Sequence, residues 1–180
     1  MFQVVVTSRN GVRDGVKKFG ATHVISITDG KLAFIHPSIP NENILRMKFD
    51  DVLDTNHPLA PRLHHIERIA AWIENLPQDA VLLVHCEAGI SRSTAIAWFA
   101  YVLKTNSPPA RAFQHILAIR PQAVPNNLIA EIIDQFFQKH HGKKYAPSFK
   151  SIADAYVNKL MITDKNLFAR RAAAAGIKTD

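Results

Sequence analysis

The stretch Val81-Leu-Leu-Val-His85-Cys86-Glu-Ala-Gly89-Ile-Ser91-Arg92-Ser93 decides the fold of this 180-residue chain. It begins with a continuous apolar run, which is typical of a central parallel strand covered on both faces. Residues 93–104 are apolar nearly all round, which predicts a buried helix. Gly89 permits a tight loop between the two. The stretch therefore predicts a strand, a short loop and a helix in direct succession.

The loop after this strand carries the candidate chemistry. A loop that joins a parallel strand to a helix N-terminus points successive backbone N–H groups into a concavity that binds tetrahedral oxyanions. Arg92, at the predicted start of the helix, adds a bidentate hold on two phosphate oxygens. Cys86 lies at the base of the same positive field, which favours the nucleophilic thiolate. A thiolate below a bound phosphate is placed for in-line attack at phosphorus.

The remainder of the chain alternates predicted strands with predicted helices. This pattern indicates an α/β fold, with a central mostly parallel sheet flanked by helices and a helical C-terminal tail. Ser107 is expected to cap a helix whose first residue is Pro108, and Asn126 is expected to cap the next helix. Strands are predicted over residues 2–7, 23–27 and 44–49, helices over 12–19, 63–73 and 108–120, and a loop over 31–43.

The positive charge of the chain is concentrated at its C-terminal end. Residues 1–138 carry 13 Lys and Arg against 12 Asp and Glu, whereas residues 139–180 carry 9 against 3. We expect a catalytic domain over residues 1–140 and a basic helical tail over residues 141–180. A solvated helix face and a surface for an acidic partner both explain this charge. The tail holds an apolar stripe at helical spacing, expected to pack on the domain or on a partner: Phe149, Ile152, Ala153, Tyr156 and Leu160.

Several classes of protein do not fit this sequence. The single cysteine excludes an internal disulfide and favours a reducing, cytoplasmic location. The N-terminal residues lack the pattern of a signal peptide, and no apolar stretch is long enough to span a membrane. Basic residues interleaved with aromatic ones are absent, so nucleic acid is not an expected partner.

The segment HCEAGISRS, residues 85–93, resembles the signature loop Cys-x5-Arg-Ser/Thr of the cysteine-dependent protein tyrosine phosphatases. The similarity is greatest to small dual-specificity-like members, including bacterial predicted tyrosine phosphatases. It covers roughly residues 20–138 and includes the segments ATHVISITD and LRMKFDD and the pairs Arg120-Pro121 and Pro125-Asn126.

The resemblance implies a role for each residue of the loop. Cys86 would form the phosphocysteine intermediate, and Ser93 would hydrogen-bond its sulfur and help it to leave. His85 would support the thiolate through hydrogen bonds. The phosphoryl oxygens would be bound by the Arg92 side chain and by the backbone amides of Glu87, Ala88, Gly89, Ile90, Ser91 and Arg92.

The family also needs a general acid about 30 to 40 residues before the cysteine, to protonate the leaving oxygen and then activate water. Asp50, Asp51 and Asp54 all fall in this window. Asp51 is favoured, because the second aspartate is the acid in relatives with the FDD sequence and because it directly follows the predicted strand. The other two aspartates stay open as alternatives.

The sequence thus predicts a phosphatase that hydrolyses phosphate monoesters, with phosphotyrosine in proteins as the favoured substrate and phosphoserine or phosphothreonine as further ones. No metal and no cofactor are expected. Two alternatives stay open: a phosphatase for phosphoinositides, nucleotides or RNA 5′-phosphates, and a phosphate-binding module of the same fold. The acidic Glu87 in the loop argues mildly against highly anionic substrates.

Overall fold

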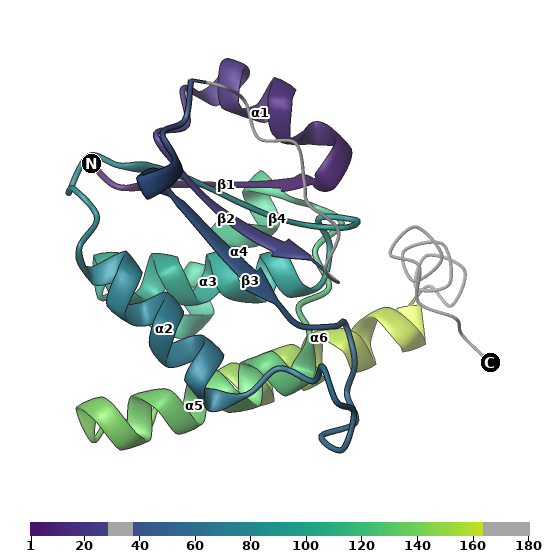
Figure 1. The fold of residues 1–180 in the computed structure, drawn as a ribbon. Helices are drawn as coiled ribbons and strands as arrows, with labels where there is room; N and C mark the ends of the chain where they lie inside the picture. Colours follow the sequence, from purple (N-terminus) through teal and green to yellow (C-terminus); the bar gives the residue numbers. More distant parts are fainter. Residues whose placement is uncertain (29–37, 164–180) are drawn as a thin grey trace.

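A four-stranded parallel sheet lies at the centre of the computed structural model, which describes residues 1–28 and 38–163 (Figure 1). The register places Ser8 opposite Cys86 and Ser26 opposite His85. The α/β fold with a mostly parallel central sheet is therefore confirmed. The spatial order of the strands is β1 (Gln3–Ser8), β4 (Val81–Cys86), β2 (His23–Thr28) and β3 (Ile44–Lys48).

Helices cover both faces of this sheet, as Figure 1 shows. One face carries α1 (Val12–Phe19), and the other carries the remaining helices. Within the described residues, no helix combines the length and the apolar character needed to cross a membrane. The helices on the second face are α2 (Leu63–Glu74), α3 (Arg92–Thr105), α4 (Pro109–Ile119), α5 (Asn127–His141) and α6 (Phe149–Thr163).

Helix α3 is the central helix of the larger layer. Trp98 and Phe99 have no exposed surface, and ten of the fourteen residues of the helix are buried. This burial explains why the sequence of α3 is apolar on all sides. Because α3 begins six residues after Cys86, its N-terminus is held directly beyond the end of β4.

Two boundaries test the cap predictions. Asn126 caps α5 as predicted, since its side-chain oxygen accepts a hydrogen bond from the N–H of Ile129 at 3.0 Å. The cap of α4 was predicted one residue too early: Pro108 is the cap and Pro109 is the first helical residue. A residue that precedes proline is disfavoured in the helical region, and Pro108 is extended with ψ 140°. Much of the predicted 31–43 loop lies outside the described residues.

Helix α6 packs on the hydrophobic core of the domain through the predicted stripe. Phe149 is fully buried and contacts Trp98 of α3, with ring centroids 4.5 Å apart, and Phe137 of α5, at 5.7 Å. Ala153 is also fully buried. Asp134 of α5 accepts hydrogen bonds at 2.9 Å from the first two N–H groups of α6. Residues 149–163 are therefore fixed against the domain.

Phe149→Ala is expected to lower the free energy of unfolding by about 3–5 kcal/mol, because it removes a fully buried ring and leaves a cavity beside Trp98. Urea denaturation of the whole chain measures this change. Met161→Ala on the same helix is the control, since Met161 is 48% exposed and should shift the midpoint only slightly. Equal effects of the two substitutions would contradict the packing of α6 described above.

Candidate active site

Cys86 is the last residue of β4 and faces the first turn of α3. Its side chain is buried, at 2% exposure, and its Sγ lies 3.2 Å from the Oγ of Ser93. The sulfur thus sits where the partial positive charge of a helix N-terminus is greatest. A hydroxyl at this distance donates a hydrogen bond to a thiolate and stabilises it.

The loop 87–91 turns its backbone carbonyl groups away from the sulfur. All five of these carbonyls accept a hydrogen bond from a neighbouring segment. Among the residues that the structure describes, the N–H groups of residues 87–92 find no acceptor within the chain. These amides are therefore available to an anion. The donors to the carbonyls are the backbone N–H groups of Arg9, Val124 and Ala95, the hydroxyl of Thr94 and the side chain of Arg120.

The side chain of Arg120 holds the Cys86 loop in place through two hydrogen bonds to its carbonyls. Its Nε donates to the carbonyl of Gly89 at 2.8 Å, and its Nη2 donates to the carbonyl of Ala88 at 3.1 Å. Burial lowers the pKa of Arg120, and the nearby Cys86 opposes this shift. The Arg120-Pro121 pair belongs to the family resemblance, but nothing in the sequence around it assigns this role. In the sequence, the available signal for Arg120 was its position just after α4. Only the folded chain brings its side chain to the Cys86 loop.

Gly89 makes close contact with β1. Its φ is +69°, a left-handed conformation that other residues rarely adopt. A Cβ at this position would overlap the backbone of Thr7 and Ser8. Since this backbone belongs to the sheet, it has little room to move. The loop can close around an anion in this shape only with glycine at residue 89.

Gly89→Ala is expected to reduce both phosphate affinity and turnover by at least about tenfold. The added Cβ forces the loop away from β1, so its backbone N–H groups no longer point towards one bound anion. Gly20→Ala is the matched control: its φ is +63°, but no atom lies within 4 Å of the added Cβ. That variant should lose about 1 kcal/mol of stability and keep its turnover. Unchanged vanadate binding by Gly89→Ala would contradict the prediction.

Arg92 reaches back from the start of α3 towards the loop that follows β3. Its Nη1 donates to the carbonyl of Phe49 at 2.9 Å, and its side chain is nearly buried. The Nε is buried and has no hydrogen-bond partner among the described residues. A buried guanidinium N–H without a partner is costly unless a ligand satisfies it. Arg92 is thus oriented to donate to an oxyanion above Cys86.

The three candidate aspartates lie in different surroundings. Asp51 faces the Cys86 loop: its Oδ1 accepts hydrogen bonds from Ser91 Oγ at 2.7 Å and from Asn126 Nδ2 at 2.8 Å. Its Oδ2 is 3.9 Å from Arg92 Nε. Asp50 instead lies 3.9 Å from the ring of His57. Asp54 is exposed and accepts a hydrogen bond from a backbone N–H two residues later in its own turn.

Asn126 has two functions in this arrangement, of which the sequence suggested only one. It caps α5 through its Oδ1, as predicted, and its Nδ2 also donates to Asp51 and to the carbonyl of Val52 at 3.2 Å. The helix cap and the aspartate loop are therefore joined through one amide side chain. Nothing in the local sequence distinguishes such an asparagine from an ordinary cap.

His85 is fully buried behind the sulfur, between β1 and β2. Burial lowers the pKa of His85 to about 4, with a smaller contribution from the charges of Arg9 and Arg92. Its Nδ1 lies 3.5 Å from the carbonyl oxygen of Cys86. The imidazole is therefore neutral at pH 7 and contacts the backbone of Cys86 rather than acting as an acid.

The pKa of His85 predicts that stability falls in mild acid. An unfolded histidine binds a proton below about pH 6.5, whereas the folded His85 stays neutral down to about pH 4. The unfolded state thus takes up more protons in this range, and His85 should cost about 3 kcal/mol of stability between pH 6.5 and 4. Denaturation of wild type and His85→Asn across this range measures the contribution as the difference in slope. Identical slopes would contradict it.

The donor set of this site suits an anion rather than a metal ion. Within residues 1–28 and 38–163, no group of three or more His, Cys, Asp or Glu side chains is placed to hold a metal. The groups that converge at Cys86 are backbone amides, a guanidinium and a hydroxyl. All of these can donate hydrogen bonds to a tetrahedral oxyanion.

Comparisons with known proteins agree with this geometry. The family model described as "Dual specificity phosphatase, catalytic domain" matches residues 4–138. Human dual specificity protein phosphatase 12 is 31% identical over 116 residues, which are 63% of this chain and 32% of that protein. Dual specificity protein phosphatase 1 of Arabidopsis thaliana is 28% identical over 114 residues, which are 62% of this chain and 52% of that protein.

Among solved structures, the crystal structure of human DUSP28 has the same fold, with a TM-score of 0.62 and 22% identity over 77% of this chain and 94% of that one. The chain spans about a third of the length of the human curated relative and about half of the Arabidopsis relative. The family match ends at residue 138, before α6 begins.

Proposed function

We propose that this chain, which belongs to the dual specificity phosphatase family, hydrolyses phosphate monoesters through a phosphocysteine intermediate, with phosphotyrosine in proteins as the main substrate. One observation carries the proposal. The sulfur of Cys86 lies under a loop whose carbonyls are all engaged elsewhere, whose amides have no acceptor among the described residues, and whose arginine has a buried Nε that makes no hydrogen bond with those residues.

The first step forms the phosphocysteine. The Cys86 thiolate attacks phosphorus in line with the leaving oxygen, so that an S–P bond forms as the P–O bond breaks. The loop amides and the Nε of Arg92 hold the three other oxygens, whose charge they stabilise in the transition state. The Oδ2 of Asp51 gives its proton to the leaving oxygen, because Oδ1 is already occupied by Ser91 and Asn126.

The second step regenerates the enzyme. Asp51, now ionised, takes a proton from a water molecule, whose oxygen attacks phosphorus and displaces the sulfur. The hydroxyl of Ser93, 3.2 Å from Sγ, stabilises the departing thiolate. The products are inorganic phosphate and the dephosphorylated alcohol, and no metal or cofactor takes part. All groups in these two steps belong to residues 1–140, which supports treating this part as the catalytic unit.

The loop itself favours substrates of moderate charge. Residues 87–91 contain no Lys or Arg, and Glu87 pairs with Arg9 at 3.4 Å. A loop of this composition offers one phosphate group its hydrogen bonds but gives further phosphates no additional cations. Phosphotyrosine carries a single phosphate and suits this site better than a polyphosphorylated inositol. Because the chemistry needs a reduced thiol, a cytoplasmic location suits the enzyme.

Phosphate release from a panel of substrates tests this function. The panel holds phosphotyrosine, phosphoserine and phosphothreonine peptides of one sequence, together with inositol phosphates and nucleotides. We expect release from phosphotyrosine peptides with the highest kcat/KM, and no loss of activity on adding a chelator. Absence of release from every monoester, with phosphate still bound, would show a binding module instead. Contact between the basic residues of 141–180 and an acidic partner stays a prediction.

A further inference from the structure

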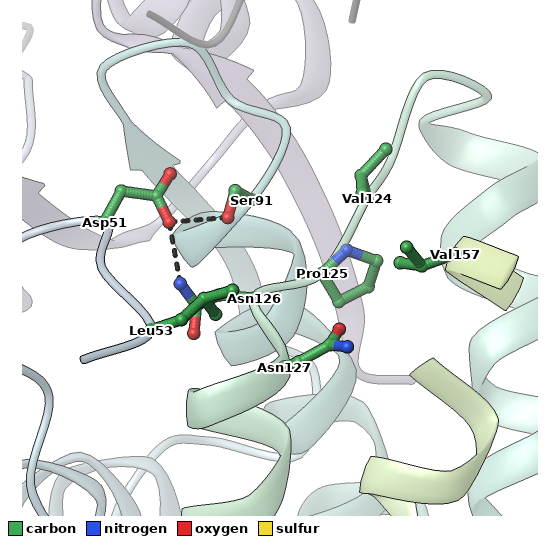
Figure 2. A pocket seen from close by; sticks show the side chains of 8 residues that line it. All are labelled: Asp51, Leu53, Ser91, Val124, Pro125, Asn126, Asn127 and Val157. Carbon is green, nitrogen blue, oxygen red and sulfur yellow. Dashed lines mark hydrogen bonds between the residues drawn. The ribbon is translucent and has the colours of Figure 1, made fainter. Parts of the chain in front are cut away.

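A cavity of about 160 Å³ opens beside the Cys86 loop. Figure 2 shows Asp51 and Ser91, joined by their hydrogen bond, on one side of it and Val157 on the other, with Pro125 between them. Leu53 also lines it. Apart from Asp51, Ser91 and two asparagines, its walls are apolar. Four segments far apart in sequence therefore form this cavity, and one of them is α6.

The position of Asp51 identifies what enters the cavity. Cys86 and Arg92, which would hold the phosphoryl group, are not among the lining residues, whereas Asp51 is. In the proposed function, Asp51 protonates the oxygen that leaves. This oxygen must therefore lie at the Asp51 end of the cavity, and the group bonded to it extends inside. The occupant is the leaving group of the substrate rather than its phosphate.

The size and lining of the cavity match one aromatic ring. An apolar protein cavity of about 150 Å³ accommodates a benzene molecule, so a volume of about 160 Å³ is sufficient for the ring of tyrosine. Leu53 is 66% exposed at this site, and an aromatic ring beside it would cover part of its surface. The short side chain of a serine would leave most of the cavity unfilled.

Helix α6 is held firmly enough to act as a wall. Asn127, which lines the cavity, donates a hydrogen bond from Nδ2 to the carboxylate of Asp154 at 2.6 Å, three residues before Val157. Phe149 anchors the start of the helix in the core. The position of Val157 is thus fixed from both α5 and the core, which is what a wall that discriminates between substrates requires.

We propose that Val157, on a helix beyond the matched family domain, is a specificity-determining residue that favours aromatic leaving groups at the Asp51 end of the site. The inference rests on the proposed function and adds a role for α6. Removing apolar contact from such a wall is expected to weaken discrimination by about tenfold, which is the lower range for a methylene-sized change in a hydrophobic pocket.

The test compares two substrates in one set of variants. The kcat/KM is measured for a phosphotyrosine peptide and for acetyl phosphate, whose leaving group has no ring, and their ratio is compared with that of wild type. Val157→Thr keeps the shape of the side chain and should lower the ratio about tenfold, as should Leu53→Ser on an exposed loop residue. Met161→Thr, on an α6 residue that does not line the cavity, should leave the ratio unchanged.

Each outcome separates the two proposals. Thermal midpoints near that of wild type establish that the variants are folded. An unchanged ratio in Val157→Thr overturns the role of α6, even where Leu53→Ser lowers the ratio, and leaves the proposed function standing. Failure of the wild-type chain to hydrolyse either substrate overturns the proposed function, and the inference falls with it.

Discussion

Cys86→Ser is expected to abolish phosphate release from phosphotyrosine peptides, with a loss on the order of 10⁴-fold or more. The serine hydroxyl stays protonated at neutral pH, so the nucleophile is lost while its position at the end of β4 is kept. The loop and Arg92 do not depend on the sulfur for their shape, because the loop carbonyls accept hydrogen bonds from Arg9, Val124 and Arg120, and Arg92 donates one to the carbonyl of Phe49. Single-turnover kinetics with the peptide measures the loss.

The affinity for an oxyanion distinguishes loss of chemistry from loss of the fold. We expect Cys86→Ser to bind inorganic phosphate with nearly the affinity of wild type, as measured by calorimetry. Ser93→Ala is the matched control. It removes the hydroxyl 3.2 Å from the sulfur but keeps the nucleophile, and should lower turnover far less. Turnover near the wild-type rate in Cys86→Ser would remove this residue from the mechanism.

Asp51→Asn is expected to lower kcat for phosphotyrosine peptides by about 10²–10⁴-fold, the usual contribution of a general acid. The amide keeps an oxygen to accept the hydrogen bonds of Ser91 and Asn126, so the loop should hold its position. For 4-nitrophenyl phosphate, whose leaving group needs no proton, the loss should be much smaller. The steady-state rates of both substrates, measured side by side, give this contrast.

The two neighbouring aspartates provide controls for the same experiment. Asp50→Asn and Asp54→Asn should each change kcat by less than about threefold, since Asp50 lies beside His57 and Asp54 bonds within its own turn, both away from the reacting atoms. A greater loss in Asp54→Asn than in Asp51→Asn would transfer the role of acid to Asp54. An equal loss with both phosphate esters in Asp51→Asn would indicate that the aspartate positions the loop rather than donating a proton.

The central part of the fold could be predicted from the sequence because its signals are local. The apolar run that becomes β4 is followed directly by the loop with its glycine and by the largely apolar helix α3. Strand, loop and helix each follow from the chemistry of a few adjacent residues. The cap at Asn126 followed in the same way. At Pro108 the restraint from a second proline moved the start of α4 by one residue.

Only the tertiary structure decided which residues contact the Cys86 loop. Three residues near this loop come from distant parts of the chain: Asp51 from an irregular loop, Arg120 from the end of α4 and Val157 from α6. They meet near residues 88–91 only in the folded chain. Irregular loops have no periodicity from which the direction of a side chain follows, so three aspartates within five residues looked alike in the sequence. Parallel strands joined through helices bring such loops to one edge of the sheet. By itself, therefore, the sequence determined the strand, the loop and the helix that position Cys86, the predicted nucleophile, whereas packing over separations of 31 to 75 residues determined which side chains surround this loop.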